Sequence, residues 1–266
     1  MKLGDKRMGR WGKTARLTNY VLRAIGIDLS KILSYRYLPK YLADRWKFKN
    51  AGGSIALHLP ILNEFNEEAG IANGQYFHQD LVVASYVYKA SPQRHIDIGS
   101  RIDGFVAHVA SFRDIEYMDI RELQPSEHER IKFIQANIMK DNPSYHEVAD
   151  SISCLHAIEH FGLGRYGDPI CPNGHTIGFT NIVRMLKDGG TLYVSFPIGT
   201  STRVEFNAQR VFHPREIFAW AGHENLELVQ FDYVDDAGRL HQSFPLMDRL
   251  PPVNRGCGIY TFRKQG

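Results

Sequence analysis

From Gly74 onward the chain alternates short apolar segments of strand character with segments of helical periodicity. The pattern predicts a helix at about 77–89, a strand at about 94–98 and a helix at about 104–112. Further strands are expected at 115–118, 131–135, 151–155, 191–196, 226–231 and 258–263. Such alternation is typical of an α/β domain with a mostly parallel sheet, here of about seven strands. The long connection between the last two strands allows an antiparallel closing strand.

The turn after the first predicted strand is the most informative site in the sequence. The strand at 94–98 runs into Gly99 and then into a predicted helix, so the backbone of the turn can approach a ligand closely. In α/β sheets, ligands bind at this carboxyl edge. Asp119 ends the next strand about twenty residues after Gly99, the separation at which an acid reaches ribose hydroxyls. We therefore expect a nucleoside pocket with Asp119 as its ribose ligand.

The glycines of this turn indicate which nucleoside is bound. A dinucleotide fold requires GxGxxG so that a pyrophosphate rests on the helix N-terminus, but Arg101 takes the place of the second glycine. The turn instead resembles the first motif of class I S-adenosylmethionine-dependent methyltransferases. In that family an acid two residues before the glycine, here Asp97, lies near the methionine part of the cofactor. Residues 135–138 resemble the family's adenine-contacting segment, and residues 185–197 resemble its helix, GG turn and fifth strand.

The resemblance covers roughly residues 76–263 and implies a Rossmann-like fold, methyltransferase activity and S-adenosyl-L-methionine as cofactor. It implies further cofactor contacts along the same strand ends, at Gly99, Ser100, Arg101, Gly104, Ile120, Asn137, Ile138 and Leu155. Residues 99–105 and 159–169 carry a closer likeness, to an uncharacterised bacterial family often associated with polysaccharide gene clusters. That likeness implies O-methylation of a sugar or glycan intermediate in polysaccharide biosynthesis.

Titratable side chains crowd the end of the predicted strand at 151–155, beside the expected cofactor pocket. An imidazole with a pKa near neutrality can take the proton of an acceptor hydroxyl as methyl transfer begins. His160 is our first candidate for this base and His156 the second, with Glu159 orienting the imidazole. Four polar side chains are expected to hold the acceptor, namely Arg165, Tyr166, Asp168 and His213.

His156, Glu159 and His160 also match the HxxEH pattern of zinc peptidases, which need both imidazoles on one face of a helix. Gly162 and Gly164 would truncate such a helix, so a peptidase is not expected. The three cysteines show no CxxC spacing, which indicates neither a disulfide framework nor a structural zinc site. No metal is predicted.

The first fifty residues hold 13 Lys and Arg against 3 Asp and Glu, a charge of +10 in a chain of net charge +3. We expect a helical basic extension over 1–73 and a methyltransferase-like catalytic domain over 74–266. The extension should contain an amphipathic helix at 16–25, an apolar and basic segment at 29–48 interrupted by Pro39, and a helix within 54–70. Its charge favours contact with a membrane surface or a phosphorylated carrier over nucleic acid.

The chain has no run of eighteen apolar residues and no apolar segment after its basic N-terminus of the kind that a secretory signal needs. The expected location is cytoplasmic, peripheral to the inner face of the membrane. Two other classes of function stay open. One is a noncatalytic binding or regulatory protein that keeps the fold, indicated by the missing glycine at Arg101. The other is an enzyme that uses a nucleotide sugar or NAD.

Overall fold

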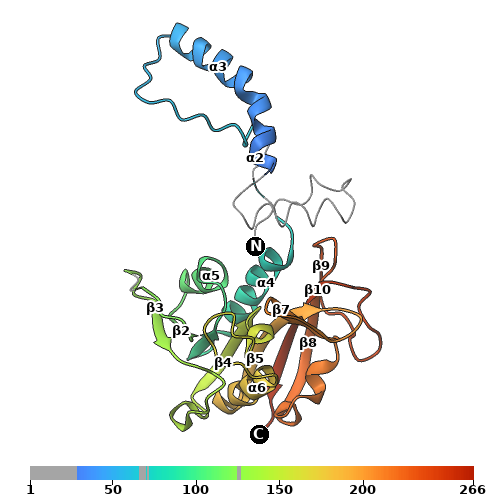
Figure 1. The fold of residues 1–266 in the computed structure, drawn as a ribbon. Coiled ribbons are helices and arrows are strands. Elements are labelled where there is room, and N and C mark those ends of the chain that lie inside the picture. The colour runs from blue at the N-terminus through green and yellow to red at the C-terminus, as the bar shows by residue number, and fades with distance from the viewer. Residues whose placement is uncertain (1–28, 66–69, 71, 125–126) are drawn as a thin grey trace. The chain divides into compact units, whose positions relative to one another are not determined.

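The chain divides into two compact units, 1–71 and 72–266, drawn in Figure 1. The computed structural model describes residues 29–65, 70, 72–124 and 127–266. The helix predicted at 16–25 lies outside the described residues. The larger unit carries the sheet on which the expected site is built, and the assignment of 74–266 as a catalytic domain stays a prediction.

An eight-stranded sheet runs through the larger unit in the order β3-β2-β1-β4-β5-β10-β8-β9. The first five strands of this order are parallel, and β10 is antiparallel to both β5 and β8. The mostly parallel α/β sheet and its antiparallel closing strand are therefore confirmed. The strands are β1 (His95–Ile98), β2 (Ile115–Asp119), β3 (Ile131–Gln135), β4 (Ala149–Leu155), β5 (Leu186–Ile198), β8 (Leu226–Val234), β9 (Leu240–His241) and β10 (Gly256–Lys264).

Helices cover both faces of the sheet. On one face, α4 (Gln75–Ala90) and α5 (Ala107–Ala110) pack through Val83 and Val109 in a buried cluster that includes Tyr193. On the other face, α6 (Gly174–Met185) packs through Phe179 in a cluster that includes Val194. Successive residues of a strand point to opposite faces, so Tyr193 and Val194 of β5 belong to different clusters. β1 and β4 are buried along nearly their whole length, and buried polar residues of the two strands, such as Asp97 and Ser153, hydrogen-bond to each other.

Several local predictions need correction. Residues 54–65 form no helix, because Pro60 lacks a backbone N–H and disfavours helical geometry in the residue before it. The helix predicted at 104–112 consists of a π-helical turn (Ile102–Val106) followed by the short α5. The expected GG turn lies within β5, where Gly189 has a φ of +72°. A hairpin that was not predicted, β6 (Arg203–Glu205) and β7 (Gln209–Val211), follows β5.

Short 3-10 turns complete the larger unit, at Pro143–Tyr145, Ile158–His160, Glu216–Ala219 and His223–Asn225. The turn at Ile158–His160 follows β4 directly and so places its side chains at the carboxyl edge of the sheet.

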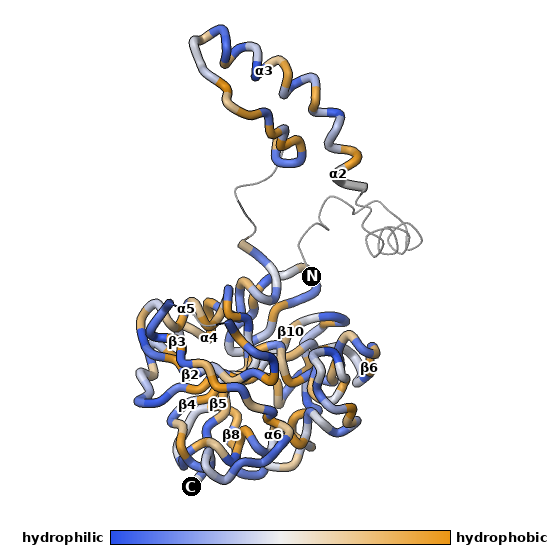
Figure 2. Tube along the Cα trace, turned by 60° about the vertical axis from the view of Figure 1, so that its left-hand side comes forward, coloured by the Kyte–Doolittle hydropathy of each residue, from blue (hydrophilic) through white to orange (hydrophobic). Residues whose placement is uncertain are grey.

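The described part of the smaller unit consists of α2 (Leu29–Ser34), a 3-10 turn (Tyr35–Tyr37), α3 (Leu38–Asn50) and a return segment over 51–65 (Figure 2). Pro39 stands in the first turn of α3, where its missing N–H has no intrahelical partner to lose. The predicted interruption is therefore the start of a helix. The return segment contacts the helical part where the rings of Tyr37 and Phe65 lie 5.7 Å apart.

Candidate functional site

A pocket opens at the carboxyl ends of β1, β2, β3 and β4, the edge at which the sequence placed the site. About 640 Å³ of space in and around its mouth is free of protein atoms, a figure that includes space open to solvent. Its walls come from the strand ends and from the loop after β4. The lining residues are Ile98, Gly99, Met118, Asp119, Ile120, Arg121, Ala136, Asn137, Ile138, Met139, His156, Ala157, His160, Phe161, Tyr166 and Asp168.

The turn after β1 forms one wall of this pocket. Gly99 has a φ of +69°, and a Cβ at this position would lie 3.0 Å from the Cβ of Ala157. Its N–H donates to the Met118 carbonyl of β2 at 2.9 Å. Glycine is therefore required here by the backbone conformation and by the close approach of the loop after β4.

Asp97 supports the turn from below the pocket. Its carboxylate is fully buried and accepts hydrogen bonds from the Ser100 N–H (3.0 Å), the Ser100 hydroxyl (2.6 Å) and the Ser153 hydroxyl (2.5 Å). The Ser100 Oγ in turn accepts from the Leu155 N–H. Burial raises the pKa of Asp97 to about 7, against the lowering effect of the two serines. Asp97 does not line the pocket, and its carboxylate holds the turn together. Its contact with a cofactor stays a prediction.

Asp119 does line the pocket, but a neighbour already occupies its carboxylate. It accepts from the Arg121 N–H (2.8 Å), from the Arg121 guanidinium (2.9 and 2.6 Å) and from the Tyr117 hydroxyl (2.8 Å). Burial alone would raise the pKa of Asp119, but these donors hold it below its usual value. The Arg121 side chain is 48% exposed and its guanidinium lies 4.3 Å from the centre of the Tyr166 ring. A diol can reach Asp119 only if that guanidinium moves away.

His156, Glu159 and His160 form a buried cluster on the opposite wall. Glu159 Oε1 lies 2.8 Å from His156 Nδ1 and 3.7 Å from His160 Nε2. Among the described residues, His156 Nε2, Glu159 Oε2 and His160 Nδ1 are buried without a hydrogen-bond partner. Unpaired buried polar atoms are costly, so their presence beside a pocket indicates a place where a ligand or solvent completes the site.

The two histidines differ in charge. Burial of the His156 ring lowers its pKa, but the raising effect of Cys257 and the Glu159 carboxylate is larger. The pKa of His156 is therefore raised above its ordinary value. Burial lowers the pKa of His160 below its ordinary value, and the more distant Glu159 only partly opposes this. At neutral pH, His160 is therefore the neutral imidazole and the form able to accept a proton.

The loop after this cluster is organised by Asp168. Its carboxylate accepts from the backbone N–H groups of Gly162 (2.7 Å), Gly164 (3.2 Å) and Tyr166 (3.2 Å). Asp168 lines the pocket, and its oxygens accept from the loop backbone, while its role as an acceptor ligand stays a prediction. The Tyr166 ring meets the His160 ring edge-on at 5.5 Å. Arg165 is exposed and donates to the Ala208 carbonyl at 2.7 Å.

The remaining predicted cofactor residues fall into two groups, and Arg101 stands apart from both. Gly99, Asp119, Ile120, Asn137 and Ile138 line the pocket as expected. Ser100, Gly104 and Leu155 are buried beside it without lining it. Arg101 points elsewhere, since its guanidinium pairs with Asp103 and lies 5.1 Å from the centre of the Tyr76 ring.

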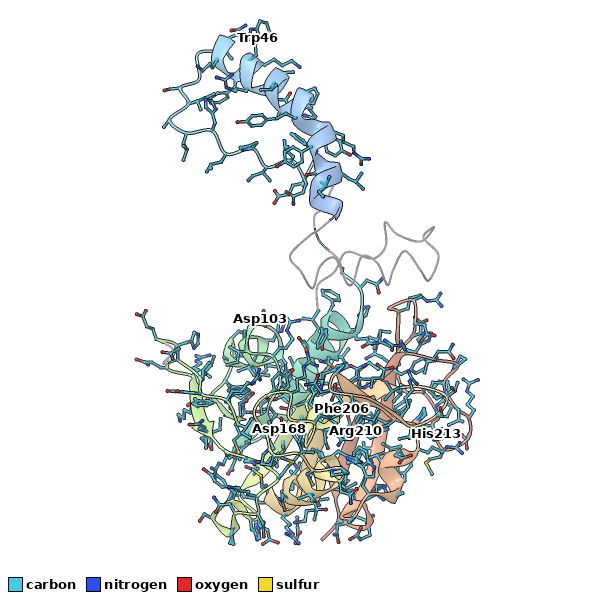
Figure 3. All side chains as sticks on the ribbon, in the orientation of Figure 1. Trp46, Asp103, Asp168, Phe206, Arg210 and His213 are labelled. Atoms are coloured by element: carbon cyan, nitrogen blue, oxygen red, sulfur yellow. The ribbon has the colours of Figure 1, made fainter. Side chains whose placement is uncertain are left out.

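His213 does not line the pocket, and its contact with the acceptor stays a prediction. Its Nδ1 accepts the Arg215 N–H at 3.2 Å and caps the backbone turn that follows. In Figure 3, His213 lies well to the side of Asp168, beyond Arg210. No group of three or more metal-ligating side chains occurs within the described ranges.

Sequence reasoning did not predict the contacts of three residues at the site. Tyr76, at the start of α4, places its ring 4.8 Å from that of His156. Arg121 binds Asp119, and its position two residues after the acid was the available signal. Arg210 of β7 is buried and donates to four backbone carbonyls, those of Glu159, Phe161, Cys171 and Pro172, at 2.7 to 3.4 Å. Nothing in the sequence pairs Arg210 with a loop some fifty residues earlier.

Known structures share this architecture. The 1,6-didemethyltoxoflavin-N1-methyltransferase of Burkholderia thailandensis, solved with 1,6-didemethyltoxoflavin and S-adenosylhomocysteine, superposes with a TM-score of 0.52. The alignment covers 87% of this chain and 90% of that one, at 14% identity. The [4+2]-cyclase SpnF also gives a TM-score of 0.52, covering 89% of this chain and 97% of the other at 15% identity.

The chain has the class I methyltransferase fold. In sequence, residues 104–232 match a family described as "Caenorhabditis protein of unknown function, DUF268". No curated protein matches the chain in sequence. The two structural relatives carry titles with different reactions, so the fold by itself leaves the reaction to be argued from the site.

Proposed function

We propose that this protein is an S-adenosylmethionine-dependent methyltransferase that methylates a hydroxyl of a sugar or glycan intermediate in polysaccharide biosynthesis. The observation that carries the proposal is the pocket between the glycine turn of β1, Asp119 of β2 and the His156–Glu159–His160 cluster of β4. At this one edge of the sheet, Gly99 and Asp119 are placed to bind a nucleoside, and His160 is a neutral imidazole beside them. The bound S-adenosylhomocysteine named for the Burkholderia relative supports the choice of cofactor.

The residues present fit the cofactor. The close approach of the backbone at Gly99 suits the methionine part, and Asp119 is the acid for the ribose hydroxyls. Ile120 and Ile138 supply apolar surface for an adenine ring, with Asn137 as the polar neighbour. When bound, S-adenosylmethionine supplies an electrophilic methyl group.

His160 is the base in this proposal. His160 would accept the proton of the acceptor hydroxyl as the hydroxyl oxygen takes the methyl group, whose bond to the sulfonium sulfur would break to leave S-adenosylhomocysteine. The unpartnered, buried Nδ1 of His160 is available for this proton. His156 is held by Glu159 as a charged pair, which fixes the turn and leaves His160 neutral. Tyr166 and Arg165 stand beside His160 and offer hydrogen-bond donors to a polyhydroxyl acceptor.

The choice of a sugar acceptor rests on the sequence likeness at residues 99–105 and 159–169 and on the polar loop that follows β4. Catalysis within a polysaccharide pathway fits a cytoplasmic enzyme at the inner face of the membrane, the location proposed here.

Calorimetric titration of the full chain with S-adenosylhomocysteine tests the cofactor. We expect saturable binding that Asp119→Ala weakens by about 1 to 3 kcal/mol, because polar partners are left unmatched. Asp114→Ala is the matched control, since Asp114 precedes the same strand and its side chain is 64% exposed. If the chain does not bind S-adenosylhomocysteine, the methyltransferase assignment is wrong. If Asp119→Ala binds it as tightly as the wild type, the assignment of Asp119 to the ribose is wrong.

The acceptor is tested with methyl-labelled S-adenosylmethionine and a fraction of glycan and nucleotide-sugar intermediates. Acid hydrolysis followed by mass spectrometry should give an O-methyl sugar carrying the label. Label on nitrogen or carbon would contradict the hydroxyl acceptor. Cofactor binding with no transfer to this fraction would contradict the sugar acceptor while leaving the cofactor assignment intact.

A further inference from the structure

The described part of the smaller unit lacks an apolar core. Among residues 32–65, Leu62 alone is buried, and α3 has no buried residue. Ten large apolar side chains are instead exposed by 38% to 71%: Ile32, Leu33, Tyr35, Leu38, Leu42, Trp46, Phe48, Leu57, Leu59 and Ile61. Exposed apolar residues in this density mark a binding surface.

Part of this exposed set forms a stripe on α3. Leu38, Leu42 and Trp46 are spaced four residues apart and so share one face of the helix. Their exposed fractions are 38%, 49% and 64%, and Trp46 stands near the far end of the helix in Figure 3. Lys40 and Lys47 fall on the opposite side of the helical wheel. The helix therefore presents an apolar stripe with cations beyond it.

The charge around the stripe is positive. Residues 29–65 contain six Lys and Arg, at 31, 36, 40, 45, 47 and 49, against two acids, Asp44 and Glu64. Asp44 pairs with Lys40 on the helix itself. Trp, Tyr and Phe among long basic side chains make up the composition that suits the boundary between lipid headgroups and acyl chains.

We propose that this basic apolar surface, residues 32–61, binds the surface of an anionic lipid bilayer. The apolar side chains enter the headgroup boundary while Lys and Arg contact lipid phosphates and carboxylates. No helix within the described residues is long and apolar enough to cross a bilayer, so the contact is peripheral. The positive charge selects an anionic membrane over a zwitterionic one. This binding is independent of the reaction catalysed by the larger unit.

Vesicle co-sedimentation of the full chain tests this surface. We expect binding to phosphatidylcholine vesicles that contain about 30% phosphatidylglycerol and only weak binding to pure phosphatidylcholine. Binding should be lost as NaCl is raised toward about 0.5 M, because salt screens the attraction between charges and the Debye length is already only about 10 Å at 0.1 M. Lys49→Glu, on the same side of α3 as the stripe, should lower the apparent affinity about fivefold or more, because each cation near the surface contributes about one such factor. Lys89→Glu is the matched control, since both lysines lie in the last turn of a helix.

The apolar part has its own pair of variants. Trp46→Ala should lower vesicle affinity about tenfold, whereas Met247→Ala, at a side chain of nearly equal exposure (63% against 64%), should leave it unchanged. Far-ultraviolet circular dichroism serves as the folding control for all four variants. Equal binding to both kinds of vesicle, no binding to either, or insensitivity to Trp46→Ala and Lys49→Glu would overturn the proposal. So would an oligomer that Trp46→Ala dissociates, which would assign the surface to a second copy of the chain.

Discussion

At the end of β2, Asp119 accepts four hydrogen bonds, three from Arg121 and one from the Tyr117 hydroxyl. The spacing from Gly99 predicted the acid, and the acid lines the pocket. The spacing did not predict that a half-exposed guanidinium would cover it. A ribose diol and Arg121 therefore compete for one carboxylate.

The competition predicts a gain of affinity on removing the arginine. Arg121→Ala should bind S-adenosylhomocysteine about twofold to fivefold more tightly, because a half-exposed ion pair contributes no more than about 1 kcal/mol. Calorimetry measures the change, with Lys132→Ala as the control for loss of a cation whose side chain is 62% exposed. Weaker binding by Arg121→Ala would show that the guanidinium contacts the ligand itself.

His160 and His156 have different proposed roles, one in catalysis and one in stability, so their substitutions should have different effects. His160→Gln should lower kcat by about 10²- to 10⁴-fold with little change in S-adenosylhomocysteine affinity, because it removes the general base. His156→Gln breaks the buried pair with Glu159 and should instead lower the free energy of unfolding. Steady-state rates and urea unfolding distinguish the two. Full activity in His160→Gln would move the base to another group.

At the scale of elements, the strands were the most predictable part of the chain. β3 was predicted at its observed bounds, and β1, β2 and β4 within two residues, because apolar residues recur at alternate positions in each of them. The β6–β7 hairpin was missed because each of its strands has only three residues, too few to show a period. A pairing between Ile198 and Phe212 joins the segment after this hairpin to β5.

Arg210 makes the hairpin a support for the loop that carries His160. Its guanidinium is 3% exposed and binds carbonyls on both sides of His160, those of Glu159 and Phe161. Arg210→Met should lower the free energy of unfolding by about 2 to 4 kcal/mol, because buried carbonyls lose their donor. Urea denaturation measures this, and Arg263→Met on β10 is the exposed control. A loss no larger than in the control would show that solvent replaces the guanidinium at no cost.

At the scale of the whole molecule, the sheet order brings β1 between β2 and β4 and buries His95 between two serines of β4. His95 Nδ1 lies 2.9 Å from the Ser151 Oγ and Nε2 lies 3.2 Å from the Ser153 Oγ. Burial lowers the pKa of His95 to about 3, from an ordinary value of 6.5. The folded protein therefore holds this ring neutral where the unfolded chain would protonate it.

This difference predicts acid destabilisation. Below pH 6.5 His95 is protonated in the unfolded state but stays neutral in the folded state. The free energy of unfolding therefore falls as the pH falls toward 3. The contribution of His95 is about 1.4 kcal/mol per pH unit, and it vanishes above pH 6.5. In urea unfolding between pH 7 and 4, the free energy of unfolding of His95→Gln should fall less steeply with falling pH than that of the wild type. Asp97, whose pKa is raised to about 7, acts in the opposite direction in both proteins. Equal pH slopes would contradict a neutral His95.

The sequence by itself determined the strands, the glycine turn and the acid at the end of β2, because each depends on periodicity or on spacing along a short stretch of chain. Tertiary structure decided which groups are free to act. Asp97 and Asp168 are turned toward backbone and hydroxyl donors, Arg121 covers Asp119, and burial beside Glu159 separates the charges of His156 and His160. These outcomes depend on neighbours brought together by the sheet order and by burial. For Arg121 alone, its position two residues after Asp119 was a signal in the sequence.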